Sequence, residues 1–361
     1  MSVAGLRLLM TADAVGGVWQ YATALAEALL PLGVRPTLAL LGPAPDDAQR
    51  ALVPDGVALI ETGLPLDGLA DSSAAVRAAG RAITDLAQGH DVLQLNSPAL
   101  AAGGPGPVPV IAVAHGCLAT WWEAAHGGSP PADLAWQVEL NRAGLRAATA
   151  VVAPTLAYAE KVQRQYGLTQ RPIPIHNGRA PLRTADAAPA LQVFTAGRLW
   201  DRVKATDLLD DVAGTLSVPF HAAGSTTGPH GETINPRHLD LLGSLDQGGL
   251  ARCLAARPVF VSAARFEPFG LAVLEAAQAG CPLVLSDIAT FRELWDGAAL
   301  FVAPGDASGF TAAIERLLAD PTLHQQLGRA AQARATRYTP QATAAAMAAL
   351  FGRLVERRAA A

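Results

Sequence analysis

Lysine is almost absent from this chain, and neither half of the chain is basic. Of the 27 basic residues, only Lys161 and Lys204 are lysines. The 31 acidic residues outnumber the basic ones and give a formal net charge of −4. The first 188 residues carry 12 basic and 15 acidic side chains. Proteins that bind nucleic acid usually present a basic stripe. The composition therefore argues against a nucleic-acid partner.

Cysteines and long apolar runs are also scarce. Cys117, Cys253 and Cys281 are an odd number at spacings that match neither a disulfide framework nor a zinc site. No apolar stretch reaches the ~20 uninterrupted residues that a membrane-spanning helix needs. The first apolar segment, Leu6–Met10, is too short for the core of a signal peptide. We expect a cytoplasmic protein with reduced thiols and no stable membrane insertion.

Three ligand-binding motifs are missing as well. No G-x-G-x-x-G follows the first predicted strand and no G-x-x-x-x-G-K-[ST] occurs, which counts against a nicotinamide dehydrogenase and a P-loop nucleotidase. No Asp-x-Asp pair stands where a metal ion would clamp a diphosphate. The sequence predicts no metal site and no bound cofactor.

Predicted strands and helices alternate along nearly the whole chain, a pattern typical of parallel sheets in α/β layers. In the first half we expect strands at Leu6–Ala12, Thr37–Leu41, Asp91–Leu95, Val108–Ala114, Ala150–Ala153 and Ile173–Ile175, and helices at Val18–Leu30, Ala132–Ala147 and Leu156–Tyr166. In the second half we expect strands at Leu191–Ala196, Phe220–Ala223, Asp240–Leu242, Val259–Ser262, Leu283–Ser286 and Leu300–Val302.

The segment Asn177–Ala190 lacks periodicity, is rich in Pro, Ala and Arg, and predicts a linker. We expect a first domain over residues 1–182, a second over residues 191–338, and a helical tail over residues 339–361. The tail carries apolar residues at helical spacing: Met347, Leu350, Phe351 and Leu354. Two doubly wound domains should face a central cleft, because ligands of open α/β sheets bind at the carboxyl ends of the strands.

The segment Arg265–Glu275 carries the strongest chemical signal. It places Glu267 and Glu275 around a Pro-Phe-Gly turn that follows a buried strand and opens a helix. The first N–H groups of a helix are unpaired and suit an anionic phosphate. Carboxylates accept hydrogen bonds from sugar hydroxyls. The combination favours a nucleotide sugar as ligand.

A second signal opens the second half, where a predicted strand ends in Gly197-Arg198 and Lys204 follows six residues after Arg198. Two cations at the end of one strand can neutralise a diphosphate and stabilise the charge that develops as it leaves. The alternative is that both decorate a surface loop. The scarcity of lysine weighs against that alternative, because this chain seldom uses lysine on its surface.

Together these features resemble the GT-B fold, retaining glycosyltransferases of family 4, the glycogen-synthase-like group. The resemblance rests on six blocks in order: Gly16-Gly17, Ile175–Gly178, Ala196–Arg198 with Lys204, Glu267–Gly270 with Glu275, Ala279–Val284 and Phe301–Asp306. It implies two Rossmann-like domains and, as in the family, a tail that crosses back to the first domain. One departure is visible, because the family usually has Lys-Gly where this chain has Lys204-Ala205. We expect that change to alter the turn.

The resemblance implies a retaining, metal-independent hexosyltransferase that uses a UDP- or GDP-sugar and a hydroxyl acceptor. Attack from the front face, with the departing phosphate helping to deprotonate the acceptor, needs no dedicated nucleophile. Arg198 and Lys204 would hold the diphosphate, Glu267 the sugar hydroxyls, and His115 would lie near the primary hydroxyl of the donor sugar. The remaining donor-binding residues would be Gly16, Gly17, Gly197, Phe269, Gly270, Leu271 and Glu275, the last on the ribose.

The acceptor is the less determined part. Polar and aromatic residues just after predicted strands of the first domain are candidates for contacting it: Trp19, Asn96, Trp121 and Trp122. Trp19 and Asn96 are as readily explained by packing or capping. His115 could be a core histidine, but its position at a strand end facing the predicted cleft favours a functional role. Adjacent residues of a helix point about 100° apart, so only one of the tryptophan pair should face the cleft while the other packs in the core. We expect a small-molecule or saccharide acceptor.

Two rival functions remain open. One is a GT-B nucleotide-sugar epimerase, which would need further acid–base residues. The other is a non-enzymatic, two-lobed ligand-binding protein, for which the Arg198–Lys204 pair would have no purpose.

Overall fold

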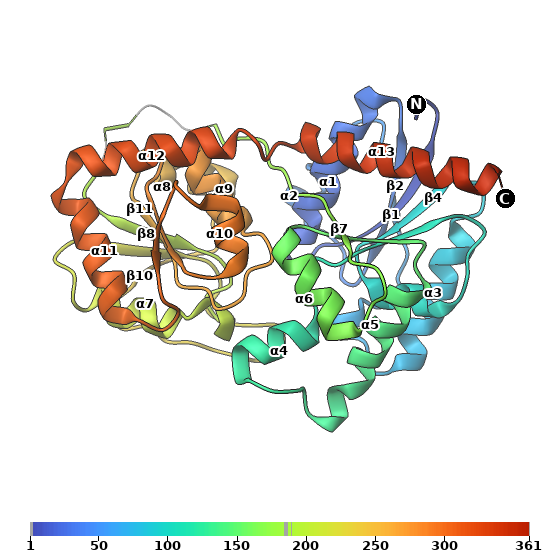
Figure 1. Cartoon of the computed structure of the whole chain (residues 1–361), viewed down its shortest axis with the longest axis horizontal. Helices are drawn as coiled ribbons and strands as arrows, with labels where there is room; N and C mark the ends of the chain where they lie inside the picture. The colour runs from blue at the N-terminus through green and yellow to red at the C-terminus, as the bar shows by residue number, and fades with distance from the viewer. Residues whose placement is uncertain (1–2, 184–186, 189, 361) are drawn as a thin grey trace. The chain divides into compact units, whose positions relative to one another are not determined.

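The structure is a computed structural model, and it describes residues 3–183, 187–188 and 190–360. The chain divides into two compact units, each an α/β layer structure (Figure 1). Unit 1 comprises Met1–Glu123, Gly127–Arg179 and Tyr338–Ala361, and unit 2 comprises Ala124–His126 and Ala180–Arg337. Within the described ranges, no helix combines the length and apolar character needed to cross a bilayer.

Unit 1 is built on a parallel sheet of seven strands in the order β3-β2-β1-β4-β5-β6-β7. The strands are β1 (Arg7–Asp13), β2 (Arg35–Leu41), β3 (Ala58–Glu61), β4 (Val92–Leu95), β5 (Val110–Val113), β6 (Ala150–Ala153) and β7 (Ile173–Pro174). The helices are α1 (Gly17–Leu29), α2 (Asp47–Arg50), α3 (Ser73–Leu86), α4 (Leu118–His126), α5 (Ala135–Ala147), α6 (Leu156–Tyr166) and α13 (Pro340–Ala359). Short 3₁₀ turns lie at Leu30–Leu32, Asp67–Leu69, Pro98–Gly103 and Ala132–Leu134.

The central strands of unit 1 are mostly apolar on both faces because helices cover the sheet on both sides. In β1 the side chains alternate: Leu8 and Met10 join one cluster, and Leu9 joins the other. The first cluster is completed by α1 and α13, and the second by α3 and α5. This alternation is the two-residue period of a strand buried between two layers.

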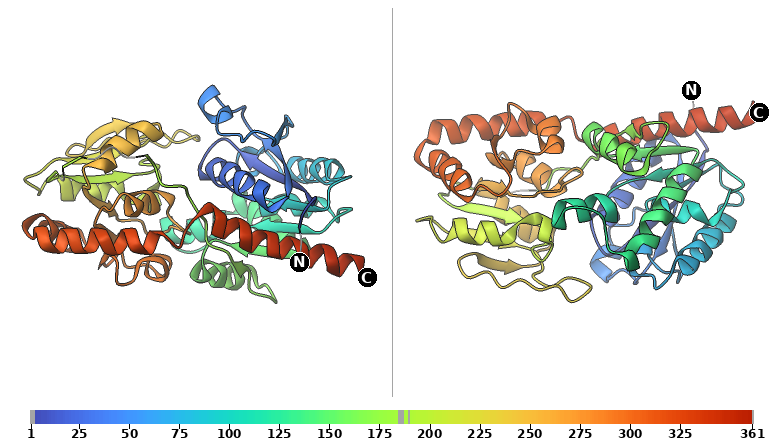
Figure 2. Two further views of the ribbon diagram at one scale, coloured as in Figure 1. Left: turned by 90° about the horizontal axis from the view of Figure 1, so that it is seen from above. Right: turned by 60° about the horizontal axis from the view of Figure 1, so that its bottom comes forward.

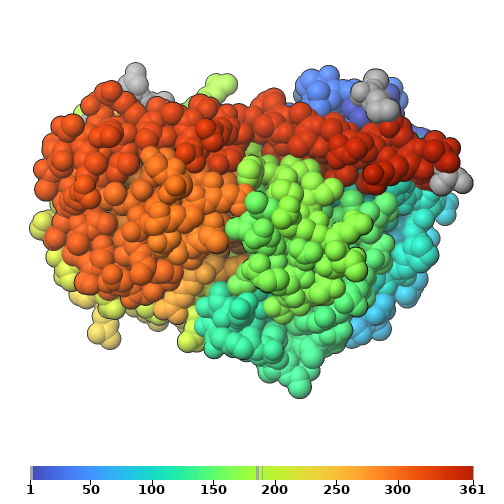
Figure 3. Space-filling view, viewed as in Figure 1, coloured from blue at the N-terminus to red at the C-terminus, as the bar shows by residue number. Residues whose placement is uncertain are grey.

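Helix α13 packs on α1, although more than 300 residues separate the two in sequence (Figure 1 and Figure 2). Its apolar stripe, Met347, Leu350, Phe351 and Leu354, is buried in the same cluster as the inward face of α1. Thr339 caps its first turn by accepting from the N–H of Ala342. The opposite side of the helix forms part of the unit's surface (Figure 3).

Unit 2 contains a parallel sheet of six strands in the order β10-β9-β8-β11-β12-β13. Its strands are β8 (Val193–Ala196), β9 (Phe220–Ala223), β10 (Asp240–Gly243), β11 (Val259–Ser262), β12 (Leu283–Ser286) and β13 (Leu300–Val302). Its helices are α7 (Thr206–Ala213), α8 (Gln247–Ala255), α9 (Leu271–Gln278), α10 (Ala289–Trp295), α11 (Ala307–Ala319) and α12 (Pro321–Ala335), with a 3₁₀ turn, η5, at Arg202–Lys204. One face of this sheet packs against α7 and α11.

The two parallel α/β sheets confirm the predicted fold class. Residues 42–90, for which the sequence analysis predicted no element, contain α2, β3 and α3. The helix predicted from Ala132 begins as a 3₁₀ turn and becomes α-helical at Ala135. The predicted linker region overlaps the boundary between the units after Arg179, and its residues 184–186 and 189 lie outside the described residues.

Candidate functional site

The candidate site of unit 2 lies where its strand order reverses. Strands β8 and β11 are adjacent in the sheet, while β9 lies on the outer side of β8 and β12 on the outer side of β11. Segments that follow two such central strands meet at the carboxyl edge of a parallel sheet, where ligands of this architecture bind. The segment after β8 supplies Arg198 and Lys204, and the segment after β11 supplies Glu267.

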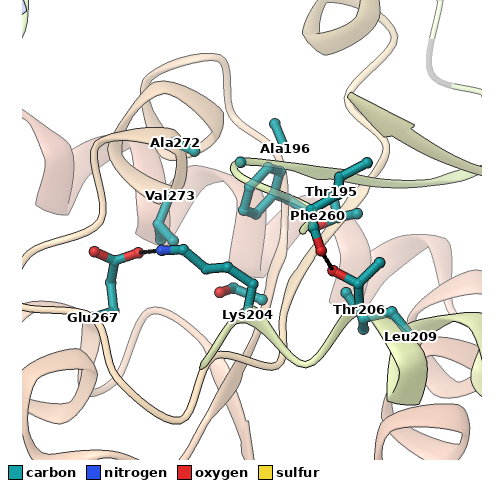
Figure 4. A pocket seen from close by; sticks show the side chains of 12 residues that line it. Thr195, Ala196, Lys204, Thr206, Leu209, Phe260, Glu267, Ala272 and Val273 are labelled. Carbon is teal, nitrogen blue, oxygen red and sulfur yellow. Dashed lines mark hydrogen bonds and ion pairs between the residues drawn. The ribbon is translucent and has the colours of Figure 1, made fainter. Parts of the chain in front are cut away.

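Lys204 and Glu267 form an ion pair at this edge, with Nζ 2.5 Å from Oε2 (Figure 4). Their side chains are 20% and 19% exposed, and both line a pocket together with Gly197 and Ala272. A backbone bond from Arg265 N–H to the Val203 carbonyl, 2.8 Å, holds the two segments together. The Lys204 ammonium has three donors, and the pair with Glu267 uses one of them.

Arg198 is held by a buried carboxylate beside it. Its Nη2 and Nε donate to Oδ2 of Asp201 at 2.8 and 3.2 Å, and Asp201 is 2% exposed against 55% for the Arg198 side chain. The guanidinium carbon also lies 5.8 Å from the ring centroid of Trp200. A flexible cation is thereby kept near one position, which lowers the conformational entropy that anion binding would otherwise cost.

The turn after Lys204 corrects one expectation. We expected alanine in place of glycine to alter the turn, but Ala205 has φ 54° and ψ 43°, the left-handed conformation that glycine favours. Its N–H donates to the Arg202 carbonyl and ends the 3₁₀ turn. The chain therefore makes a glycine-type turn with an alanine, which costs on the order of 1–2 kcal/mol.

We predict that Ala205→Gly stabilises unit 2 by about 0.5–1 kcal/mol, because relief of the left-handed strain exceeds the entropy that glycine adds to the unfolded chain. Chemical denaturation of the two proteins measures this difference. A lower free energy of unfolding in the variant would show that the buried methyl group of Ala205 contributes more than the strain costs.

Helix α9 begins at the same edge of the sheet. Gly270 precedes its first residue, Leu271, with φ +90°, and a Cβ at this position would lie 3.2 Å from Cγ of Glu267 and from the ring of Phe291. The backbone conformation favours glycine here, and any side chain would also require Glu267 or Phe291 to shift. The Glu267 carbonyl accepts from the Thr290 hydroxyl at 2.7 Å, and Phe269 is buried. Glu275, one turn into α9, is buried as well.

The candidate site of unit 1 lies at the carboxyl ends of the adjacent strands β4 and β5. Asn96 follows β4, and His115 follows β5. Their side chains meet, with His115 Nε2 3.0 Å from Asn96 Oδ1. The Tyr21 ring contacts the imidazole edge-on, with centroids 4.5 Å apart. Burial lowers the pKa of His115 to about 4 and raises that of Tyr21 well above its usual range.

The glycine loop of unit 1 connects β1 to α1. Gly16 is the N-cap of α1 in an extended conformation, and Gly17 is the first helical residue. A Cβ at Gly16 would meet open space. The N-terminal N–H groups of α1 therefore lie at the same carboxyl edge of the sheet as Asn96 and His115.

The aromatic candidates for the acceptor need two corrections. Trp19 is fully buried, and its Nε1 donates to the Gln49 carbonyl at 3.1 Å, so its ring has no face for an acceptor. Trp121 and Trp122 on α4 are both half-buried and contact each other edge-on at 6.1 Å. The expectation that one of the pair packs in the core is therefore wrong.

Sequence reasoning missed three residues that hold the predicted ones. Asp201 lies three residues after Arg198, a spacing that brings its carboxylate within reach of the guanidinium. Gln94 and Thr11 contact Asn96 from inside β4 and β1. Their polarity within otherwise apolar strands is the signal that could have identified them, because a buried polar side chain needs a partner.

Comparisons with known proteins give two family matches along the chain. Residues 15–181 match the model described as Glycosyltransferase Family 4, and residues 190–320 match Glycosyl transferases group 1. A glycogen synthase of Mycobacterium tuberculosis is 39% identical over 97 residues. That alignment covers 26% of this chain and 23% of the relative, so the similarity to this relative is local.

Solved structures match over nearly the whole chain. A sucrose-phosphate synthase of Thermosynechococcus elongatus has a TM-score of 0.79 at 19% identity, covering 98% of this chain and 100% of that chain. HepE of Anabaena, in complex with UDP-glucose, has a TM-score of 0.73 at 19% identity, covering 97% and 100%. WaaG, a glycosyltransferase of lipopolysaccharide biosynthesis, has a TM-score of 0.72 at 13% identity, covering 96% and 99%. At these identities the matches establish the shared fold.

Proposed function

We propose that the chain, which matches two glycosyltransferase family models in succession and shares the fold of the solved structures above, is a GT-B glycosyltransferase that transfers a hexose from a nucleoside diphosphate sugar to a hydroxyl acceptor with retention of anomeric configuration. The observation that carries this proposal is that Arg198 and Lys204 both follow β8 at the carboxyl edge of the unit 2 sheet, where Lys204 pairs with Glu267 from the segment between β11 and α9.

The two cations suit a diphosphate leaving group. The Arg198 guanidinium lies beside Trp200, and it still has N–H groups that do not donate to Asp201. The Lys204 ammonium likewise has two N–H groups beyond the one that donates to Glu267. As the bond between the anomeric carbon and the phosphate oxygen breaks, negative charge grows on that oxygen. Cations fixed before the reaction stabilise this charge without reorganising.

The carboxylates and the start of α9 suit the rest of the donor. Glu267 would accept hydrogen bonds from sugar hydroxyls while it orients Lys204, and the first N–H groups of α9, from Gly270 and Leu271 onward, would face phosphate or sugar oxygens. Glu275 would bind the ribose, and Phe269 and Gly197 would contribute backbone. In unit 1, the proposed donor-binding residues are Gly16, Gly17 and His115.

In this proposal the anomeric configuration is retained because the acceptor hydroxyl attacks the anomeric carbon from the same face that the diphosphate leaves. The departing phosphate oxygen takes the proton of the acceptor hydroxyl while that hydroxyl oxygen bonds to the anomeric carbon. No enzyme nucleophile forms a covalent intermediate, so the required groups are those that stabilise the diphosphate.

A donor screen tests this function. The purified chain is incubated with UDP-, GDP- and ADP-sugars, with UDP-glucose first because the HepE structure contains it. Released nucleoside diphosphate is measured with and without a panel of hydroxyl acceptors, and the anomeric configuration of the product is read by proton NMR. An inverted product would contradict retention, and an epimerised donor without acceptor would favour an epimerase.

We predict that transfer persists in excess chelator, because Arg198 and Lys204 supply the positive charge that a divalent ion supplies elsewhere. Initial rates are compared with and without EDTA at saturating donor. Loss of activity that Mg²⁺ or Mn²⁺ restores would contradict this prediction.

We also propose that the acceptor is a small molecule or saccharide. Helix α1 carries no lysine or arginine, and the first 188 residues are acidic on balance, so this part of the chain offers little attraction to an anionic bilayer. Trp121 and Trp122 remain the aromatic candidates for contacting a sugar ring, with each ring half-buried. We predict no more than weak co-sedimentation with phosphatidylglycerol-containing liposomes at physiological salt, and strong binding would overturn the proposed acceptor class.

A further inference from the structure

Buried polar side chains of unit 1 form a hydrogen-bonded series that ends on His115. Thr11 lies in β1, Gln94 in β4 and Asn96 directly after β4, and all three are at least nine-tenths buried. Asn96 lies at the centre of the series and contacts the other three residues. The series exceeds what packing requires, because apolar residues would fill these positions without needing partners.

The orientation of the Asn96 amide is fixed by a backbone group. Its Nδ2 lies 2.6 Å from the carbonyl oxygen of Thr11, which can only accept. The backbone N–H of Asn96 also donates to the Thr11 hydroxyl at 2.8 Å. With the amide nitrogen committed to Thr11, the atom that faces His115 must be the oxygen.

This orientation determines the state of the imidazole. Asn96 Oδ1 accepts from Gln94 Nε2 at 3.2 Å, and an acceptor 3.0 Å from His115 Nε2 requires that nitrogen to carry the proton. Burial lowers the pKa of His115 to about 4, so the ring is neutral near pH 7 and its Nδ1 carries a lone pair. Among the described residues, none donates to Nδ1.

We propose that Asn96 is a positioning residue, which holds His115 as the neutral tautomer protonated at Nε2 so that Nδ1 accepts a hydrogen bond from a substrate hydroxyl. The edge contact of Tyr21 fixes the plane of the ring for this purpose. The catalytic consequence rests on the proposed glycosyl transfer, whereas the tautomer itself does not. In this proposal Asn96 acts through His115 and does not itself contact the acceptor substrate.

Nitrogen-15 NMR of the full chain with labelled histidine tests the tautomer directly. The chain has eight histidines, and His115→Gln identifies the signal by its loss. We expect wild-type His115 to show the pattern of a neutral ring protonated at Nε2 near pH 7. A ring protonated at Nδ1 would overturn the proposal whether or not any sugar is transferred.

Substitutions then test the positioning role. Asn96→Asp keeps the shape but places a carboxylate at Nε2, so we expect the His115 signal to move toward the imidazolium and kcat/KM to fall about tenfold. Asn96→Ala removes the acceptor, and we expect mixed tautomers. If no nucleotide sugar is turned over, the expected spectra still support the positioning role, and the failure concerns the proposed function alone.

The chain offers a matched control in Asn141 on α5. Asn141 is as buried as Asn96, since each residue is 8% exposed. Its Nδ2 donates to the Gln137 carbonyl. Asn141→Asp introduces the same charge at equal burial without contacting His115, so we expect neither the His115 signal nor kcat/KM to change. Equal changes in the Asn96 and Asn141 variants would reduce the role of Asn96 to general stability and overturn the proposal.

Discussion

Replacing Lys204 with alanine is expected to lower turnover by about 100-fold or more while the fold stays intact. The ammonium is the cation nearest Glu267, and both side chains lie in the pocket at the carboxyl edge of the unit 2 sheet. Removal leaves the diphosphate without one of its two cations as charge develops on it, and losses of this size follow the deletion of a single group that stabilises such charge. Steady-state release of nucleoside diphosphate measures the effect.

The only other lysine of the chain provides the control. Lys161 also pairs with a glutamate, with Nζ 3.1 Å from Glu123 Oε2, but at a more exposed position on α6. Exposed pairs of this kind contribute about 0–1 kcal/mol. Lys161→Ala should therefore leave turnover unchanged. If both variants lose activity equally, or Lys204→Ala keeps wild-type activity, the diphosphate role of Lys204 is wrong.

The local parts of the fold could be predicted from sequence because they depend on short patterns. Strands β9, β11, β12 and β13 have the bounds that the sequence predicts. The region 42–90 was missed although Ser72 caps α3 and its buried residues Val76, Ala79 and Ile83 follow helical spacing. The two faces of this helix differ clearly in polarity, so the pattern was readable from the sequence.

Contacts between distant segments could not be read in the same way. Lys204 and Glu267 are 63 residues apart, and they meet because β8 pairs with β11 in the sheet. Strand order is a property of the folded sheet and leaves no local trace in either segment. The sequence placed both side chains at strand ends, but it gave no reason for an ion pair between them.

Trp19 was predicted to contact the acceptor, but it is fully buried, as its position on the helix indicates. It lies three residues before Ala22, on the helix face that also carries Leu25, Ala26 and Leu29. A large ring on that face fills the core, and its indole N–H finds a backbone carbonyl. Its position just after a predicted strand was a weaker indication than helical periodicity.

Arg198→Ala is expected to lower turnover by about 100-fold or more, for the same electrostatic reason as the change at Lys204. The effect has a second part, because Asp201 is buried and Arg198 supplies two of its donors. Without the guanidinium this carboxylate repels a diphosphate nearby. We therefore expect Arg198→Lys, which keeps the charge but loses the fork geometry, to recover only part of the activity.

Arg292 matches Arg198 closely enough to separate catalysis from structure. It donates to Asp287 from Nε at 2.7 Å, its guanidinium carbon lies 4.0 Å from the Phe301 ring centroid, and its side chain is 45% exposed against 55% for Arg198. Arg292→Ala thus removes an arginine with the same kinds of partner from the same unit. Because Asp287 is 42% exposed whereas Asp201 is 2% exposed, we expect Arg292→Ala to lower the unfolding midpoint no more than Arg198→Ala does and to leave kcat unchanged. Equal loss of kcat in the two variants would mean that the effect at Arg198 is structural, and the proposed diphosphate site would then rest on Lys204 alone.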